Sequence, residues 1–183
     1  MHFSPITLTT ERLTLRWFTP ADADALFSIF ADPDVVRYWS SPEWADTSHA
    51  HQMIEDTIAG YTSGDGVRFA VVLTATGELV GQVNLGHMFH SNRRCEVGYA
   101  MASAYWGKGY ITEALVAAFD YAFGPLNLNR IEADIDPRND ASEKVLQRLG
   151  FKKEGFMPER WIVKGEVSDT TFYGLLKRDW EAR

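Results

Sequence analysis

The chain begins with an alternating pattern of hydrophobic and polar residues and then changes to helical spacing. Residues 7–18 carry leucines at roughly every second position among threonines and arginines, a pattern that predicts a strand. Thr19 and Pro20 then supply an N-cap and a first-turn proline, and apolar residues follow at helical spacing. A second helix is predicted over 47–63, after an aromatic-rich loop at 38–44. The first third of the chain therefore predicts one strand and two helices.

Strand and helix patterns continue over the rest of the chain. Alternating segments predict three consecutive strands at 67–73, 79–88 and 94–101. Apolar residues on one face then predict a helix, and helix and strand patterns alternate to the end of the chain. These later elements are a helix at 107–123, a strand at 127–135, a helix at 139–149 and strands at 151–157 and 167–177.

The predicted order of elements is βαα-βββ-α-β-α-ββ, which contains seven strands. Consecutive strands come first and strand-helix-strand units follow, a combination typical of α+β proteins with a mixed, mostly antiparallel sheet flanked by helices. The sequence has no internal repeat, low-complexity segment or long linker, and 183 residues suffice for one substantial core. We therefore expect a single domain over 1–183.

Composition and charge narrow the classes of function. Hydrophobic residues make up 45% of the chain and aromatic residues 13%, which excludes a disordered protein. The net charge of −7 argues against nucleic acid and anionic membranes as partners and mildly favours a cationic substrate. No apolar run approaches the roughly 20 residues that cross a bilayer, and no signal-peptide pattern is present. A lone cysteine, Cys95, excludes an intrachain disulfide and fits a reducing compartment, so we expect a cytoplasmic protein.

The segment 105–114 contains the most informative motif. It places Gly107 and Gly109 between a predicted strand and the start of a predicted helix. Unpaired amides at the positive end of a helix form a ready pyrophosphate site, and glycines let the backbone approach an anion closely. The lysine and glycine spacing does not match a P-loop, and Thr112 stands where a dinucleotide fingerprint needs its last glycine. A plain glycine turn that starts a helix is the alternative.

This segment, Tyr-Trp-Gly-Lys-Gly-Tyr followed by Thr-Glu-Ala, resembles the acetyl-CoA motif Q/R-x-x-G-x-G/A of the GNAT superfamily of N-acetyltransferases. Gly109 matches the central glycine, whereas Trp106 and Ile111 stand at the first and last positions of the motif. The segments 136–142 and 148–151 resemble the N-x-x-S…L-G-F element of the branch that contains ribosomal-protein N-terminal (alanine or serine) acetyltransferases. The opening Leu-x-x-Glu-Arg-Leu-x-Leu-Arg and the closing segment are similar in layout, so the resemblance covers nearly the whole chain.

The resemblance implies a GNAT-like central sheet and a binding site for acetyl-CoA, the acetyl donor. The strand at 99–101 is implied to pair with the pantetheine arm and to supply a backbone amide that polarises the thioester carbonyl. The loop and first helical turn at 107–112 are implied to hold the pyrophosphate through backbone amides. The implied cofactor-binding residues are Tyr99, Ala100, Met101, Trp106, Gly107, Lys108, Gly109, Tyr110, Ile111, Thr112 and Asn139.

Two residues are candidates for the catalytic groups. Ser142 is a candidate to protonate the departing CoA thiolate, since the tyrosine that other family members use corresponds to Leu146 here. Glu96 is the candidate general base that removes a proton from an ammonium substrate. Each candidate has a plainer interpretation. Ser142 is then an ordinary first-turn serine, Glu96 a paired surface carboxylate, and Asn139 a helix N-cap.

The aromatic residues Tyr38, Trp39 and Trp44 lie in a region that the resemblance assigns to the acceptor pocket. Aromatic rings bind cationic amines well, although a packed loop cluster is the alternative. The implied acceptor is a primary amine, either a protein N-terminus or a small molecule. Transfer is expected to be direct, in a ternary complex, and a homodimer is compatible with the sequence.

Other functions fit the sequence less well. A covalent acyl-enzyme on Cys95 is disfavoured because strand alternation places it on the face opposite Glu96, and no histidine motif accompanies it. The histidines at positions 49 and 51 and at positions 87 and 90 lack a further ligand, so no metal is expected. A nucleotide-phosphate enzyme needs a lysine–hydroxyl pair that the loop lacks. The main alternative function is a noncatalytic acyl-CoA-binding sensor or interaction module.

Overall fold

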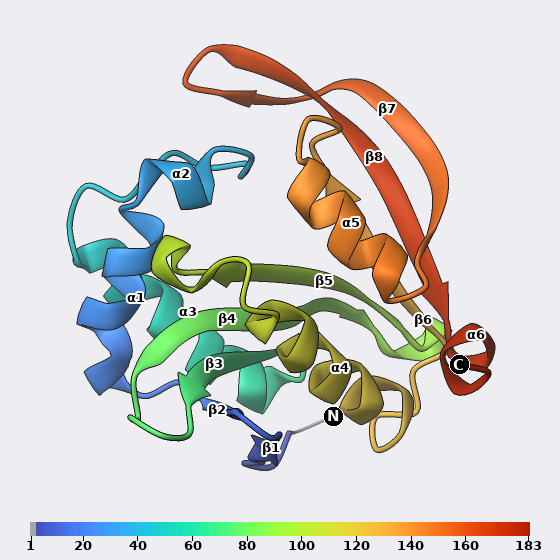
Figure 1. The fold of residues 1–183 in the computed structure, drawn as a ribbon, viewed down its shortest axis with the longest axis horizontal. Helices are drawn as coiled ribbons and strands as arrows, with labels where there is room; N and C mark the ends of the chain where they lie inside the picture. Colours follow the sequence, from blue (N-terminus) through green and yellow to red (C-terminus); the bar gives the residue numbers. More distant parts are fainter. Residues whose placement is uncertain (1–2) are drawn as a thin grey trace.

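The structure is a computed structural model that describes residues 3–183. These residues form one eight-stranded sheet with the order β1-β2-β3-β4-β5-β6-β8-β7 (Figure 1). The strands are β1 (Leu8–Thr9), β2 (Leu13–Trp17), β3 (Val67–Leu73), β4 (Leu79–Phe89), β5 (Arg94–Met101), β6 (Arg130–Ile135), β7 (Lys152–Val163) and β8 (Glu166–Leu176). The helices are α1 (Ala23–Phe30), α2 (Pro33–Val36), α3 (Ser48–Ser63), α4 (Tyr110–Phe123), α5 (Asp140–Arg148) and α6 (Lys177–Glu181), with short 3-10 turns η1 (Pro20–Asp22), η2 (His90–Asn92) and η3 (Ser103–Tyr105).

All neighbouring strands run antiparallel except β5 and β6, which are parallel. This confirms the predicted mixed, mostly antiparallel α+β sheet flanked by helices. The strand count exceeds the prediction by one, because the stretch predicted as a single strand folds back on itself. Leu8 of β1 lies opposite Leu15 of β2. No helix within residues 3–183 is both long and apolar enough to cross a membrane.

The final hairpin is longer than the sequence pattern predicted. β7 continues to Val163 and not to Met157. Its register with β8 shifts between Met157 and Trp161, where Glu159 adopts a positive φ of 50°. A bulge of this kind breaks the strict alternation of sides, which explains why the pattern ended early.

Helices cover both faces of the sheet (Figure 1). α4 and α5 pack on one face, where the larger core cluster contains the fully buried Phe119, Ile131 and Leu146. α1 and α3 pack on the other face, around the buried Leu26 and Ile54. Since successive side chains of a strand point to opposite faces, each central strand contributes to two separate cores.

β5 and β6 separate after a short paired segment. Their parallel pairing covers only residues 94–96 and 130–132 and ends with Glu96 opposite Glu132. β6 then continues beside β8, whereas the second half of β5 keeps a strand neighbour, β4, on one side alone. The two strands therefore open a wedge in the middle of the sheet.

The open edge of β5 presents backbone groups to this wedge. Ala102 N donates to a carbonyl oxygen of β4 at 2.9 Å, and peptide groups alternate in direction along a strand. The amide of Val97 belongs to the pairing with β6, so the amide of Tyr99 is the first that faces the open wedge. The carbonyl oxygen of Met101 faces the same way and accepts a hydrogen bond from the indole nitrogen of Trp106 at 2.7 Å. This bond ties the end of the open strand to the loop that follows it.

Candidate functional site

The glycine loop leads directly into α4. Gly107 and Gly109 have φ values of 72° and 80°, in the left-handed region that favours glycine. Gly109 is the N-cap of α4, so the helix begins at Tyr110 and not at Gly107 as the sequence pattern predicted. The first helical bond runs from Glu113 N to Gly109 O (3.1 Å), which leaves the amides of the first turn without an intrahelical acceptor. The start of α4 thus has free backbone amides beside two left-handed glycines.

Arg12 holds this loop in place. Its Nη1 donates to the carbonyl oxygen of Lys108 at 3.0 Å, and its Nε donates to Glu113 at 2.6 Å. The backbone amide of Arg12 and the hydroxyl of Thr10 also donate to Glu113. The guanidinium lies over the ring of Tyr110, with 4.5 Å between its carbon and the ring centroid. The opening Glu-Arg-Leu motif, which the sequence linked only to the family layout, therefore supports the glycine loop.

A cavity of about 540 Å³, here called the loop cavity, lies between the open strand β5, the glycine loop and α5. It brings together the predicted cofactor-binding residues except Lys108 and Thr112, which do not line it. The lining members of the predicted set are Tyr99, Ala100, Met101, Trp106, Gly107, Gly109, Tyr110, Ile111 and Asn139. The Lys108 ammonium instead lies 4.9 Å from the ring centroid of Tyr105.

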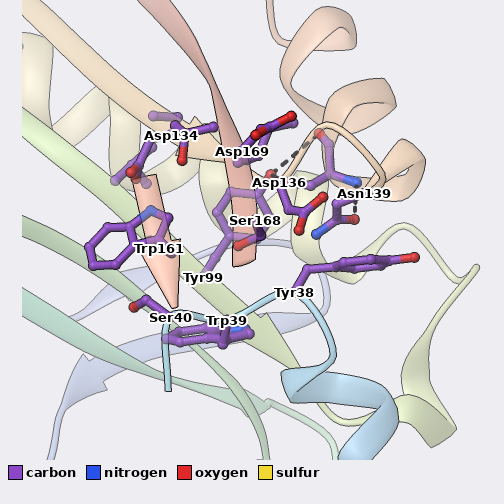
Figure 2. Close-up of a pocket in the computed structure, with 16 residues that line it drawn as sticks. Tyr38, Trp39, Ser40, Tyr99, Asp134, Asp136, Asn139, Trp161, Ser168 and Asp169 are labelled. Carbon is purple, nitrogen blue, oxygen red and sulfur yellow. Dashed lines mark hydrogen bonds between the residues drawn. The ribbon is translucent and has the colours of Figure 1, made fainter. Parts of the chain in front are cut away.

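A second cavity of about 190 Å³, here called the wedge cavity, lies in the opening between β5 and β6. Figure 2 shows it between the segment that follows α2 and the β7–β8 hairpin. Its aromatic lining residues are Tyr38, Trp39, Tyr99 and Trp161, and its acidic lining residues are Asp134, Asp136 and Asp169. Glu43 and Lys164 form an ion pair that joins the two sides next to this cavity. The wedge cavity is therefore acidic, aromatic and small.

The two cavities meet at residues that line both of them: Tyr38, Trp39, Tyr99, Asn139 and Ser142. At this junction the hydroxyls of Tyr99 and Ser142 are hydrogen-bonded at 2.7 Å. Burial raises the pKa of Tyr99 to about 12, so its hydroxyl keeps its proton at neutral pH. Asn139 caps α5, because its Oδ1 accepts from the amide of Ser142 at 3.0 Å. The plainer interpretation of Asn139 as an N-cap thus holds, and the residue also lines both cavities.

The three carboxylates of the wedge cavity differ in their surroundings. Burial raises the pKa of Asp134, and the guanidinium of Arg160 at 3.7 Å offsets this only in part. Asp136 has a lowered pKa because Arg138 binds it, with 2.6 Å between Nη2 and Oδ2. Asp169 accepts a hydrogen bond from a backbone amide of β7 at 2.8 Å. Asp134 is therefore protonated more easily than Asp136.

Glu96 lies outside both cavities. It is the last residue of β5 that is paired with β6, and its Oε2 is 2.9 Å from Nδ1 of His87. Its side chain is 41% exposed. Glu96 is thus a carboxylate paired with a neighbouring side chain near the start of β5, as in its plainer interpretation.

The predicted aromatic trio is divided between two places. Tyr38 and Trp39 line the wedge and loop cavities. Trp44 instead stacks on Phe30, with ring centroids 4.5 Å apart, and lines a third cavity beneath α3. Trp39 also contacts Phe30 edge-on at 4.9 Å, so the packed-cluster interpretation applies to part of this loop.

Cys95 is buried in the core under α4, on the sheet face opposite Glu96 as strand alternation predicted. Burial raises the pKa of its thiol to about 12, which keeps it protonated and unreactive. Within residues 3–183, no three or more histidine, cysteine, aspartate or glutamate side chains are grouped so as to hold a metal ion.

The sequence did not single out Asp134, Trp161 or Ser168, although all three line the wedge cavity. Asp134 is the second-to-last residue of β6, and the other two lie on the bulged hairpin. No motif marks them. Asp134 continues the polar positions of an alternating strand after Arg130 and Glu132, so the pattern did not set it apart.

Comparisons with known proteins agree with this geometry. The family model described as acetyltransferase (GNAT) domain matches residues 12–152. The chain is 38% identical to p20, an uncharacterized N-acetyltransferase of Bacillus licheniformis, over 95% of this chain and 98% of that protein. It is 29% identical to the ribosomal protein uS5-alanine N-acetyltransferase of Escherichia coli (strain K12), over 96% of this chain and 93% of that protein.

A solved structure of the same kind has the same fold. The ribosomal-protein-S5-alanine acetyltransferase from Vibrio fischeri has a TM-score of 0.84 to this chain at 25% sequence identity. The match covers 96% of this chain and 98% of that one. Sequence and fold therefore agree over nearly the whole length of the chain.

Proposed function

This chain belongs to the GNAT acetyltransferase family, and from that premise we propose that it is an acetyl-CoA-dependent enzyme that acetylates a primary amine by direct attack in a ternary complex. The observation that carries the proposal is the junction at Tyr99 and Ser142. There a cavity suited to a thioester ligand meets a cavity suited to a cationic amine. A donor and an acceptor bound on the two sides would place their reacting atoms together.

The loop cavity is the proposed donor site. The free amides at the start of α4 would hold the pyrophosphate, and the left-handed glycines keep side chains out of its way. The open edge of β5 would pair with the pantetheine arm in the manner of an added strand. The amide of Tyr99, which faces the open wedge, would stabilise the oxyanion of the tetrahedral intermediate.

The proposed reaction forms a nitrogen–carbon bond and breaks the carbon–sulfur bond of the thioester. The amine attacks the acetyl carbon, the intermediate collapses, and CoA leaves as a thiolate that must take up a proton. Ser142 would donate this proton and recover one from Tyr99, and the proton that the attacking nitrogen loses as the intermediate collapses would restore the Tyr99 hydroxyl, whose raised pKa favours its protonated form. Cys95 takes no part, because its thiol is buried in the core under α4.

An ammonium substrate must first lose a proton, and we assign this step to Asp134. Asp134 lines the wedge cavity and is partly desolvated, whereas Glu96, the sequence-based candidate, is paired with His87 outside it. A carboxylate with a raised pKa is a stronger base than one exposed to water. Asp134 thus combines position and basicity.

The acceptor class follows from the wedge cavity. Three carboxylates and four aromatic rings favour a cationic amine over a neutral or anionic group. The small volume admits only the amine end of a larger molecule, so both a protein N-terminus and a small amine fit. The Escherichia coli relative is named for a protein N-terminal alanine, which supports the first of these. We place the enzyme in the cytoplasm, where a lone thiol is stable.

Calorimetric titration of the purified protein with acetyl-CoA, followed by a thiol-release screen over amines, tests the proposal. We expect micromolar binding and CoA release with one class of amine. ATP should not compete for the site, because the loop lacks the lysine–hydroxyl pair of a P-loop. Binding without release from any amine would favour the alternative of a noncatalytic acyl-CoA sensor, and absence of binding would overturn the assignment of the loop cavity.

A further inference from the structure

The third cavity has a volume of about 590 Å³ and lies between α3 and the sheet, on the face opposite α4. We call it the α3 cavity. Its principal lining residues are Trp44, His49, Met53, Arg68, Asn84 and His87. Neither the acetyl donor site nor the wedge cavity includes these residues, so the proposed reaction leaves the α3 cavity without a role.

Arg68 of β3 places a guanidinium in this cavity without a counter-ion. Its Nη1 donates to Gln82 at 2.8 Å and to the sulfur of Met53 at 3.4 Å. In the described part of the chain, no carboxylate forms an ion pair with Arg68, and no hydrogen bond uses its Nε or Nη2. Burial lowers the pKa of Arg68 to about 10, which still leaves it charged at neutral pH.

The other charged groups around the cavity are already engaged or lie at its rim. Asp56 and Asp65 are exposed, and they accept hydrogen bonds from Gln52 and Ser63. The imidazoles of His49 and His87 lie 3.8 Å and 2.9 Å from carboxylates outside the cavity lining. A desolvated cation without a partner is costly, and an anion beside it would offset that cost.

A direct row of residues connects Arg68 to the wedge cavity. In the sheet register Arg68 lies opposite Asn84, and Asn84 lies opposite Gly98, which lines the wedge cavity. The three residues share the sheet face that α3 covers, and a Cβ at Gly98 would meet no atom within 4 Å. Two strand spacings amount to about 10 Å, so this is the distance from Arg68 to the wedge along the row.

We propose that the α3 cavity is a second ligand site that binds an oxyanion, a carboxylate or a phosphate, through the Nε and Nη2 hydrogens of Arg68. The planar guanidinium offers two parallel donors that match such a group. The oxyanion comes either from the far end of the acceptor, about 10 Å from its amine along the row described above, or from a free small anion. The site itself is independent of which amine the enzyme acetylates.

Binding of inorganic phosphate and of succinate to the purified protein tests the site directly. Calorimetry should show saturable binding to the wild-type protein and to the control Arg148→Met, whose side chain is exposed on α5. Arg68→Met, checked for folding by circular dichroism, should bind at least about tenfold more weakly, as expected for loss of a charged hydrogen-bonding partner. Equal binding by the two variants, or no binding by the wild-type protein, would overturn the proposal.

A measurement on the wild-type protein covers the case in which Arg68→Met does not fold. The through-bond-assigned Nε–Hε resonance of Arg68 should shift saturably as phosphate is added, and that of Arg148 should not. An unmoved Arg68 resonance at saturating phosphate contradicts the site. This test needs neither acetyl-CoA nor turnover, so its outcome is separate from that of the proposed acetyltransferase activity.

Thiol-release kinetics then identify the source of the anion. ω-Aminooctanoate has a terminal carboxylate that octylamine lacks. The distance from its amine to this carboxylate matches the length of about 10 Å between the wedge cavity and Arg68. If the acceptor supplies the oxyanion, the wild-type enzyme should have a KM for ω-aminooctanoate at least about tenfold lower than its KM for octylamine. Arg68→Met should remove this difference between the two KM values. If phosphate binds at Arg68 but the two KM values are equal, the oxyanion is a free ligand. In both cases Arg68 is the cation of the site.

Discussion

The loop cavity and the wedge cavity meet at the Tyr99–Ser142 pair, yet they are built in different ways. The loop cavity takes half of its lining from one continuous run, residues 99–111, where the start of α4 leaves backbone amides free. The wedge cavity takes its lining from the segment after α2, from β5 and β6, and from the β7–β8 hairpin, and it presents mainly side chains. The amides of the proposed donor side thus come from a local structure, whereas the proposed acceptor side is a tertiary one.

This difference suggests how the two sides tolerate change. A site made of backbone amides accepts many side-chain substitutions, provided that the conformation of the glycines is preserved. A site made of carboxylates and rings from distant segments changes its preference when any one of them changes. Relatives with the same donor side can therefore act on different amines, as fold-level similarity alone allows.

The largest expected effect is on the donor side. Gly109→Glu places a side chain at a φ of 80° and a carboxylate against the pyrophosphate. Strain and charge repulsion together should weaken acetyl-CoA binding by a factor of about 100 or more, measured by calorimetry. Gly77→Glu is the matched control, because Gly77 has a φ of 75° in the β3–β4 turn and a Cβ there would meet no atom within 4 Å. Unchanged acetyl-CoA affinity in Gly109→Glu contradicts the donor site.

The next effect compares Asp134, which lines the wedge cavity, with Glu96, which lies outside both cavities. Asp134→Asn should lower kcat by a factor of about 100 at neutral pH with little change in acetyl-CoA affinity, because the general base is lost. Glu96→Gln should cost less than about tenfold, since its carboxylate is paired with His87 outside the cavity. The reverse order of effects would restore Glu96 as the base.

The pH profile sharpens the same assignment. Because burial raises the pKa of Asp134, its basic form is lost as pH falls through a value above the usual range of an aspartate. The fall of kcat/KM on the acid side should therefore occur at a higher pH than it would with an exposed carboxylate as the base. Asp134→Asn should abolish this fall. A fall that persists unchanged in the variant would show that another group titrates.

A smaller effect is expected at the junction of the two cavities. Ser142→Ala and Tyr99→Phe should each lower kcat by about tenfold, a modest cost because a thiolate leaves readily without full protonation. Since the two hydroxyls act as one unit, the double variant should cost no more than either single change. Ser28→Ala, at an exposed serine of α1, is the control and should leave kcat unchanged. Additive losses would mean that the hydroxyls act separately.

The smallest effect is expected at Arg12, which supports the glycine loop from outside. Arg12→Met removes the bond to the Lys108 carbonyl and the pair with Glu113, both partly exposed to water. The KM for acetyl-CoA should rise about three- to fivefold with kcat nearly constant, the cost of a partly exposed ion pair and hydrogen bond. Arg148→Met serves as the control for loss of a positive charge. An unchanged KM would show that the loop keeps its shape without Arg12.

The local features of this protein were readable from the amino-acid sequence. Alternation identified the central strands, and Gly107 and Gly109 marked the loop because few other residues adopt its left-handed backbone. Asn139 indicated the start of α5 because its short polar side chain caps a helix from within three residues. Each of these depends on neighbours in the chain, so the information lies within a short stretch of sequence.

The meeting of distant segments was decided by the tertiary structure. Asp134, Trp161 and Tyr38 share a cavity only because β6 leaves β5 after Glu96 and the bulged hairpin curls towards the loop after α2 (Figure 1). The separation of Trp44 from Trp39 has the same origin, since packing against Phe30 places the two rings over different cavities. The spacing of residues in the sequence does not predict such contacts, because they form between elements whose relative positions depend on the whole core.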